Sequence, residues 1–168
     1  MAANPENLTN LVTAGALRPH QPQDWEIASH LERAKNLLHD AKLKDATLDG
    51  RYNNAYSAAH ALAQAAFKLR GFRTADSRGH RQTLFSALEH AVPAIGKEQS
   101  IFEKAHSLRN KAEYDGDPID LQQSMVDDLV RAAGSLQTEV KLLYKAWRIQ
   151  QSRTILFNTP SRGTSRRS

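Results

Sequence analysis

Apolar residues recur along this chain at helical spacing, and the pattern divides most of it into five long segments. Stripes of buried character run through residues 23–44, 51–70, 81–92 and 101–114. A near-heptad series then extends to about residue 150, at Met125, Leu129, Ala132, Leu136, Val140, Leu143 and Trp147. Spacings of three and four residues are typical of helices that bury one face. The sequence therefore predicts an all-α fold, a mainly antiparallel bundle of four to five helices.

The first two long segments have the clearest core faces. The stripe of residues 23–44 consists of Ile27, Leu31, Ala34, Leu38 and Ala41, and that of residues 51–70 consists of Ala55, Tyr56, Ala59, Leu62, Ala63, Ala66 and Leu69. Small residues let neighbouring helices approach closely, so the second helix should be central. Tyr52, Tyr56 and His60 follow one edge of it. We interpret the tyrosines as boundary residues with satisfied hydroxyl groups and leave His60 open.

Helix-breaking residues set the expected boundaries. Asn4 and Pro5 predict the start of a short N-terminal helix, which Gly15 and Pro19 end. Asp49-Gly50 should separate the first two long helices, and residues 71–79 should form a loop. Gly116 as a stop, Asp117 as a cap and Pro118 at the first helical position should separate the last two. The predicted organisation is an arm and linker over 1–22, a bundle over 23–150 and a tail over 151–168.

Charge is concentrated at the C-terminal end. The chain of 168 residues has a net charge of +5, and Lys141–Ser168 contains seven basic residues and no acidic one, which leaves −2 for Met1–Val140. We expect residues after Gln151 to be mobile and to help bind an anionic or protein partner. The apolar triplet Ile155-Leu156-Phe157 could pack back onto the bundle or dock a partner.

The composition also excludes several classes of protein. The chain has no cysteine, so it has no disulfide framework and no thiolate metal site. No apolar run is long enough for a membrane span, and the N-terminus lacks the pattern of a signal peptide. We therefore expect a cytoplasmic protein without a membrane association. Phosphate-loop, nucleophile-elbow and HExxH motifs are absent, and the histidines lack metal-ligand spacing, so we expect neither a cofactor nor a metal.

Two stretches carry candidate chemistry. The first is Phe102–Tyr114. With the preceding Ile101, it has an expected buried stripe of Ile101, Ala105, Leu108 and Ala112, and a polar neighbouring face of His106, Arg109, Asn110 and Glu113. This face is either a solvated flank with a Glu/Arg pair worth about 0.2–0.5 kcal/mol or a phosphate site, and spacing alone favours the flank. The loop after residue 70 is basic, with Arg70, Arg73, Arg78, His80 and Arg81 against Asp76. It suits a phosphate, although solvated surface arginines are common.

Three stretches together resemble a HEPN domain: Tyr52–Gly71 (YNNAYSAAHALAQAAFKLRG), Gly79-His80-Arg81 and Leu108–Gly116 (LRNKAEYDG). HEPN domains are small helical bundles of prokaryotic defence and toxin–antitoxin systems, and the similarity extends from about Trp25 to Trp147. In catalytic members, an Arg, a polar residue and a His a few positions later form a metal-independent ribonuclease site. Two protomers usually place this helix face to face, so the resemblance implies a homodimer.

The resemblance assigns roles to particular residues. Arg109 and Asn110 match the first two elements of the motif, and Tyr114 stands near the expected position of its histidine. His80 or His106 could replace that histidine, because tyrosine, with an ordinary pKa of about 10, is a poor base near neutral pH. The predicted catalytic residues are Arg109, Asn110, Tyr114, His80 and His106. The predicted phosphate-binding residues are Arg73, Arg78, Arg81 and Arg109.

Three functions follow from these patterns. The first is a HEPN-like protein that binds RNA, a nucleotide or a protein partner in a defence or toxin–antitoxin context, and the tyrosine at position 114 favours it. The second is an active endoribonuclease toxin, in which a base would activate the ribose 2′-hydroxyl group and Arg109 would stabilise charge on the phosphate. The third is a structural adaptor bundle that docks a partner through its tail.

Overall fold

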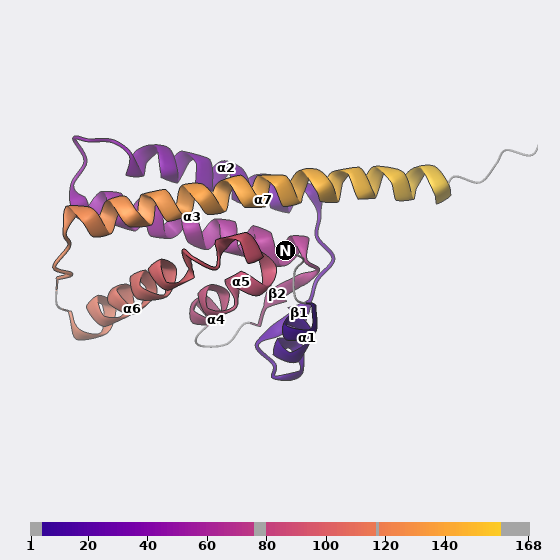
Figure 1. The fold of residues 1–168 in the computed structure, drawn as a ribbon, viewed down its shortest axis with the longest axis horizontal. Coiled ribbons are helices and arrows are strands. Elements are labelled where there is room, and N and C mark those ends of the chain that lie inside the picture. Colours follow the sequence, from indigo (N-terminus) through magenta and orange to yellow (C-terminus); the bar gives the residue numbers. More distant parts are fainter. Residues whose placement is uncertain (1–4, 76–79, 117, 159–168) are drawn as a thin grey trace, which may run out of the picture.

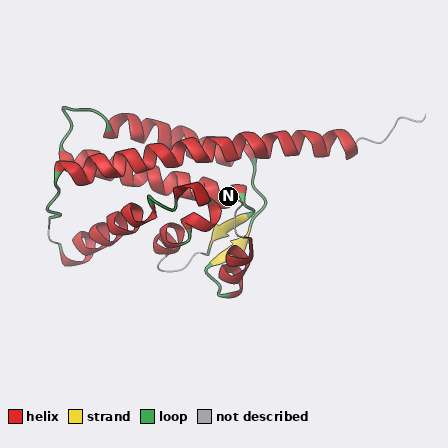
Figure 2. Cartoon of the chain, in the orientation of Figure 1, coloured by secondary structure: helices red, strands yellow, loops and turns green. Residues whose placement is uncertain are grey.

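The computed structural model describes residues 5–75, 80–116 and 118–158, apart from the side chains of residues 5, 80, 113–115 and 155–158. Within these ranges the chain is mostly helical (Figures 1 and 2). The helices are α1 Pro5–Thr13, α2 Asp24–Ala41, α3 Leu48–Leu69, α4 His80–Ser86, α5 Leu88–Ala91, α6 Gln99–Asp115 and α7 Gln123–Asn158, with a 3₁₀ turn at Pro93–Ile95. Two short strands, β1 Leu17–Pro19 and β2 Phe72–Thr74, complete the fold. The predicted all-α bundle is confirmed.

Helix α3 is the centre of the bundle, as its alanine-rich face predicts. It packs between α2 and α7 on one side and α4, α5 and α6 on the other (Figure 1). Its buried residues surround the helix: Tyr52, Ala55, Tyr56, Ala58, Ala59, Ala61, Leu62, Ala63, Ala65, Ala66 and Phe67. Helix α2 buries the five residues of its predicted stripe, from Ile27 to Ala41. Small side chains on α3 permit the close approach of three long helices.

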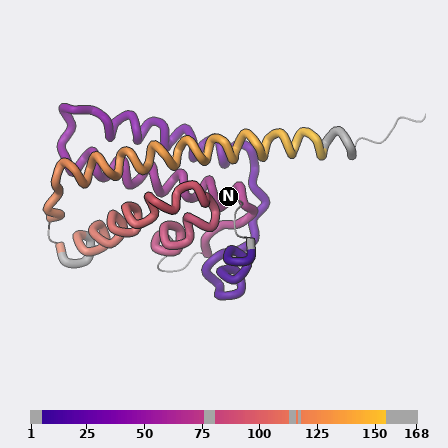
Figure 3. Tube along the Cα trace, viewed as in Figure 1, coloured from indigo at the N-terminus to yellow at the C-terminus, as the bar shows by residue number. Residues whose placement is uncertain are grey.

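Helix α7 is longer than its apolar pattern predicts. Its buried residues are Val126, Leu129, Ala132, Ala133, Leu136 and Val140, and the helix then continues beyond the bundle to Asn158 (Figures 1 and 3). The expected end near residue 150 is therefore wrong, and part of the expected mobile tail is helical. The side chains of Ile155, Leu156 and Phe157 lie outside the described part of the chain. No helix among the described residues is long and apolar enough to cross a membrane.

A two-stranded antiparallel sheet ties the N-terminal arm to the bundle, and the sequence did not predict it. Leu17 pairs with Thr74, Arg18 with Arg73 and Pro19 with Phe72. These strands lie at the end of the expected arm and in part of the expected loop, where the sequence predicted no strand. Only three residues on each side take part, and they come from distant parts of the chain. Pairing of this kind leaves no local periodicity to detect.

Three helix boundaries also differ from the predictions, each for a local reason. Asp49-Gly50 lies inside the first turn of α3, because the Thr47 hydroxyl group accepts a hydrogen bond from the Gly50 N–H at 3.1 Å and caps the helix. The expected helix over 81–92 is divided at Ala87. There the Gln99 side chain accepts from the Glu89 N–H at 2.8 Å and donates to the Ser86 carbonyl at 3.0 Å.

The third difference is the start of α7 at Gln123, so Pro118 is not its first residue. Ile119 and Leu121 pack against the core two residues apart, a spacing that suits extended chain better than a helix. The expected cap Asp117 lies outside the described residues. Gly116 ends α6 as predicted, with a φ of 71° that favours glycine.

Candidate functional site

Helix α6 is rotated relative to the orientation that its aliphatic residues predict, although Ala105 of the predicted stripe is buried. Phe102 is fully buried, and Ala105 and His106 are 4 % and 7 % exposed, whereas Ile101 and Leu108 are only half-buried. The buried residues follow one another at i, i+3 and i+4, and the large ring of Phe102 sets the rotation of the helix. His106 was predicted on a polar face beside the core. It lies instead inside the edge of the core.

Aromatic rings from two other helices pack near His106. The ring of Tyr56 on α3 is nearly parallel to the imidazole, with centroids 6.3 Å apart, and the ring of Phe85 on α4 lies 6.0 Å away. Phe85 also contacts Tyr56 at 5.5 Å and Phe102 at 5.9 Å. The packing of these rings restricts the orientation of the imidazole.

Both ring nitrogens of His106 have hydrogen-bond partners. Nδ1 lies 2.8 Å from the hydroxyl oxygen of Tyr56, and Nε2 lies 2.9 Å from the amide nitrogen of Asn110. An amide nitrogen can only donate, so in this arrangement Nε2 accepts, and Nδ1 carries the proton and donates to Tyr56. We call these three residues the Tyr56–His106–Asn110 chain. It runs from the buried interior of α3 to the half-buried Asn110 on α6.

Arg109 lies over the same tyrosine. Its guanidinium carbon is 4.7 Å from the centre of the Tyr56 ring, which is a cation–π contact. Arg109 is half-buried, and its guanidinium group lies against the ring of Tyr56, which is itself buried. Tyr56 thus holds two neighbouring α6 residues, Arg109 directly through its ring and Asn110 through His106.

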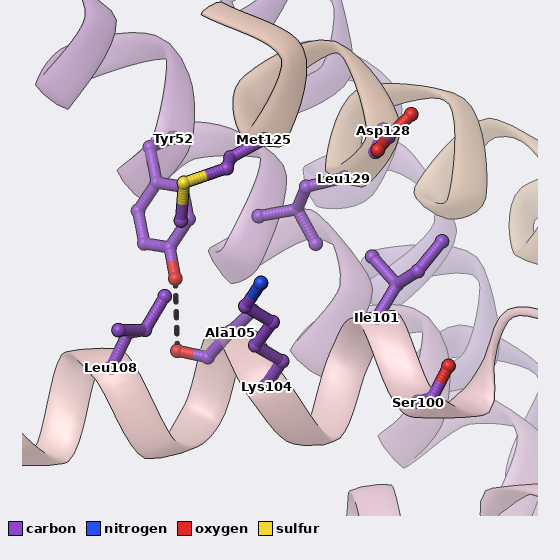
Figure 4. Close-up of a pocket in the computed structure, with 9 residues that line it drawn as sticks. All are labelled: Tyr52, Ser100, Ile101, Lys104, Ala105, Leu108, Met125, Asp128 and Leu129. Carbon is purple, nitrogen blue, oxygen red and sulfur yellow. Dashed lines mark hydrogen bonds between the residues drawn. The ribbon is translucent and has the colours of Figure 1, made fainter. Parts of the chain in front are cut away.

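The second buried tyrosine of α3 has a structural role. The Tyr52 hydroxyl group donates to the backbone carbonyl of Ala105 at 3.0 Å (Figure 4). Burial raises the pKa of Tyr52 to about 12, with a further rise from Tyr56 and a smaller opposing effect of the Arg109 charge. Tyr52 therefore stays protonated near neutral pH. Both tyrosines have satisfied hydroxyl groups, as interpreted from the sequence, but they are core residues and not boundary residues.

A pocket of about 380 Å³ lies between α4 and α6, next to the Tyr56–His106–Asn110 chain. Two members of this chain, His106 and Asn110, form part of the pocket wall. The other lining residues are Gln82, Phe85, Ser86, Glu103 and Ser107. The pocket thus combines an aromatic wall with hydroxyl and amide groups and one carboxylate. Such a lining suits an uncharged polar group, for example a ribose or a base, better than a phosphate.

A second pocket, of about 240 Å³, lies on the opposite side of α6, between that helix and α7 (Figure 4). Its walls are mainly apolar and include Tyr52, Ile101, Leu108, Met125 and Leu129, with polar groups from Ser100, Lys104 and Asp128. It shares no lining residue with the pocket next to His106. The two pockets are therefore separate.

The structure brings together three of the predicted site residues, His106, Arg109 and Asn110. Arg73 lies on β2 and lines a separate small pocket with Lys68 and Thr74. Arg81 is half-buried in the first turn of α4.

The remaining predicted residues are not placed. The whole of Arg78 and the side chains of His80 and Tyr114 lie outside the described part of the chain. Among the residues that are described, no group of three His, Asp or Glu side chains is arranged to hold a metal ion.

Sequence reasoning missed the role of Tyr56 and the contribution of Phe85. One signal was present for Tyr56, because a polar-tipped ring stands among alanines on the most buried helix of the chain. Its partners, however, lie some 50 residues away in sequence. No local pattern connects them.

No protein-family model and no curated protein matches this chain. Its function must therefore be inferred from the residues of α6 and from the chemistry that their arrangement allows.

Proposed function

We propose that this chain is a HEPN-like domain that binds a phosphate group of RNA or of a nucleotide at Arg109 and Asn110. The observation that carries this proposal is the shared anchoring of the two residues. Arg109 lies over the Tyr56 ring at 4.7 Å, and Asn110 is hydrogen-bonded to His106, whose other nitrogen is bonded to Tyr56. A planar cation and an amide held side by side are well suited to a phosphate.

The anchoring lowers the cost of binding. A long side chain in water loses roughly 0.5–1.5 kcal/mol of conformational free energy when a ligand immobilises it. Arg109 is already restricted by the Tyr56 ring, and Asn110 by His106, so part of this loss occurs on folding. The adjacent pocket supports the same ligand class. Its carboxylate, Glu103, disfavours a phosphate inside the pocket, whereas Gln82 and Ser107 can bond ribose hydroxyl groups or base edges.

The geometry supports binding better than cleavage. A general base must present an accessible lone pair to the ribose 2′-hydroxyl group. Both nitrogens of His106 have partners within the Tyr56–His106–Asn110 chain, and Tyr52 has a pKa of about 12. His106 therefore suits the positioning of Asn110 more than the removal of a proton from a substrate.

The proposal includes a homodimer, because HEPN domains commonly place the corresponding helices face to face. In such a dimer each α6 would bring one Arg109 to a shared nucleic-acid backbone. Two arginines on neighbouring phosphates would bind RNA more tightly than one, since the second contact forms within the complex already made.

Binding of a labelled single-stranded RNA, followed by fluorescence anisotropy, tests the proposal. Loss of a charge-assisted contact costs about 1.5–3 kcal/mol, so Arg109→Ala should weaken binding roughly 10- to 150-fold. Arg109→Lys should weaken it less, because it keeps the charge but loses the planar fork. The matched control is Lys104→Ala, which removes an exposed cation from the same helix. Unchanged binding by both Arg109 variants would show that the site is elsewhere.

The same protein can be incubated with mixed RNA in EDTA to test the endoribonuclease alternative. Fragments with cyclic-phosphate ends, lost in Arg109→Ala, would establish cleavage. Intact RNA together with Arg109-dependent binding is the result we expect.

A further inference from the structure

The C-terminal third of α7 carries a surface that the α6 site does not use. Val140 is the last fully buried residue of α7 in the described chain, and the helix continues past the bundle (Figure 1). Leu142 and Ile149 are 57 % and 48 % exposed, and both side chains are large and apolar. A shallow groove of about 360 Å³ lies next to Ile149, lined by Lys141, Tyr144, Lys145, Arg148, Ile149 and Ser152. We call Leu142 and these groove residues the α7 surface.

Most of the positive charge of this surface has no acidic partner among the described residues. No acidic residue occurs from Lys141 to the end of the chain. Lys141 and Lys145 form no ion pair with any described residue. Arg148 approaches Asp24 at 3.4 Å, but both side chains are more than half exposed, so solvent weakens this pair. The α7 surface therefore attracts anionic groups and repels a surface like itself.

The base of the α7 surface is anchored to α2. The Tyr144 hydroxyl group donates to the Asp24 carboxylate at 2.8 Å. The rings of Tyr144 and Trp147 are stacked with centroids 6.3 Å apart, and the Arg148 guanidinium carbon lies 5.7 Å from the centre of the Tyr144 ring. The hydrogen bond joins α7 to α2, and the two ring contacts lie within α7. A partner would therefore meet a helix that is already formed and lose little binding free energy in ordering it.

We propose that the α7 surface docks an acidic amphipathic helix of a partner protein. Leu142 and Ile149 are seven residues apart, two helical turns along one side, and Lys145 lies between them. A partner helix with apolar residues at heptad spacing and carboxylates beside them would cover both apolar side chains and pair with the lysines. This inference is independent of the RNA site on α6.

Charge and exposure argue against two other occupants. Antiparallel pairing with α7 of a second copy would bring Lys141, Lys145 and Arg148 close to the same three residues of that copy. Like charges in contact are unfavourable. An RNA backbone would satisfy the cations but would leave Leu142 and Ile149 without an apolar partner, because phosphate and sugar offer mainly polar atoms.

The two tryptophans of the chain provide a direct assay. Trp147 belongs to the ring stack of the α7 surface, and Trp25, which is 71 % exposed, follows Asp24. Intrinsic fluorescence of the full chain therefore reports binding at this end of the bundle. The probe is a synthetic peptide of three heptads with leucine at the a and d positions and glutamate at most others. A scrambled peptide of the same composition is its control.

We expect saturable binding of the amphipathic peptide and none of the scrambled one. Leu142→Glu and Lys145→Glu should each weaken it at least fivefold. The matched controls are Leu43→Glu and Lys44→Glu, exposed positions between α2 and α3 at the opposite end of the bundle, and these should bind within twofold of the parent (Figure 1). All four positions are exposed, so melting temperatures should stay close to that of the parent.

Three results would overturn the proposal. The first is equal binding of both peptides, and the second is equal weakening by surface and control variants. In the third, the acidic peptide does not bind. Fluorescence changes instead with RNA or with increasing protein concentration, and Leu142→Glu abolishes that change. That result would assign the α7 surface to RNA or to a second copy.

Discussion

Replacing Tyr56 by phenylalanine separates the two ways in which this tyrosine holds the α6 site. The substitution keeps the ring under Arg109 but removes the hydroxyl group that bonds His106 Nδ1 at 2.8 Å. The contact of Arg109 with the ring should survive. Asn110 should lose its fixed orientation, because His106 is no longer held from its other side.

The expected cost follows from the burial of the bond. Tyr56 is 2 % exposed and His106 is 7 % exposed, so water does not readily replace the hydroxyl group. Losing a buried hydrogen bond costs about 1 kcal/mol, and about 1–3 kcal/mol when the partner finds no replacement. In a chain of this length, each kcal/mol lowers the melting temperature by about 2–4 °C. We therefore expect a decrease of roughly 2–12 °C by thermal denaturation.

The matched control is Tyr52→Phe. Tyr52 is also 2 % exposed on α3, and its hydroxyl group donates to the Ala105 carbonyl at 3.0 Å. Both variants should be destabilised to a similar extent, but only Tyr56→Phe should weaken RNA binding, by about threefold to tenfold if one amide contact to phosphate is lost. Equal RNA affinities for the two variants would refute the idea that the Tyr56–His106–Asn110 chain positions a ligand contact.

Three other measurements test the fold and the assembly. Burial alone would raise the pKa of Glu26, but hydrogen bonds from the Gln23 N–H, His20 and Lys68 lower it from 4.5 to about 2. The stability from this carboxylate is complete above about pH 5 and disappears as the pH falls toward 2. In urea titrations, Glu26→Gln should therefore cost on the order of 2 kcal/mol at pH 7 and flatten the acid dependence. Gly116→Ala should cost about 1 kcal/mol in the same assay, because the φ of 71° favours glycine, and RNA binding should not change. Light scattering at high micromolar concentration should show a dimer, and a monomer would contradict the face-to-face assembly of α6.

The parts of the fold that sequence predicted are those that depend on one long local pattern. The stripe of α2 contains only apolar residues at regular spacing, and all five are buried. The alanines of α3 leave few arrangements other than a central helix. The missed features depend on distant partners. β1 and β2 pair across more than 50 residues, and Gln99 divides α4 from α5 by bonding backbone groups ten or more residues away.

The candidate site shows the same limit. Sequence placed Arg109 and Asn110 beside the core, but it read His106 as part of a polar face. Periodicity cannot distinguish a polar residue at the edge of the core from one inside it when both follow the same spacing. Only the ring of Phe85 and the hydroxyl group of Tyr56, from two other helices, show why His106 is buried.

The central claim is that Arg109 contacts a phosphate, and the salt dependence of RNA binding tests it most directly. For single-stranded nucleic acid, each phosphate contact contributes about 0.7 to the slope of the logarithm of the association constant against the logarithm of salt concentration. Arg109→Ala should reduce the magnitude of this slope by about 0.7 for each Arg109 that contacts the RNA, and Lys104→Ala should leave it unchanged. An Arg109→Ala protein with the slope of the parent would contradict the account, even if its affinity were lower.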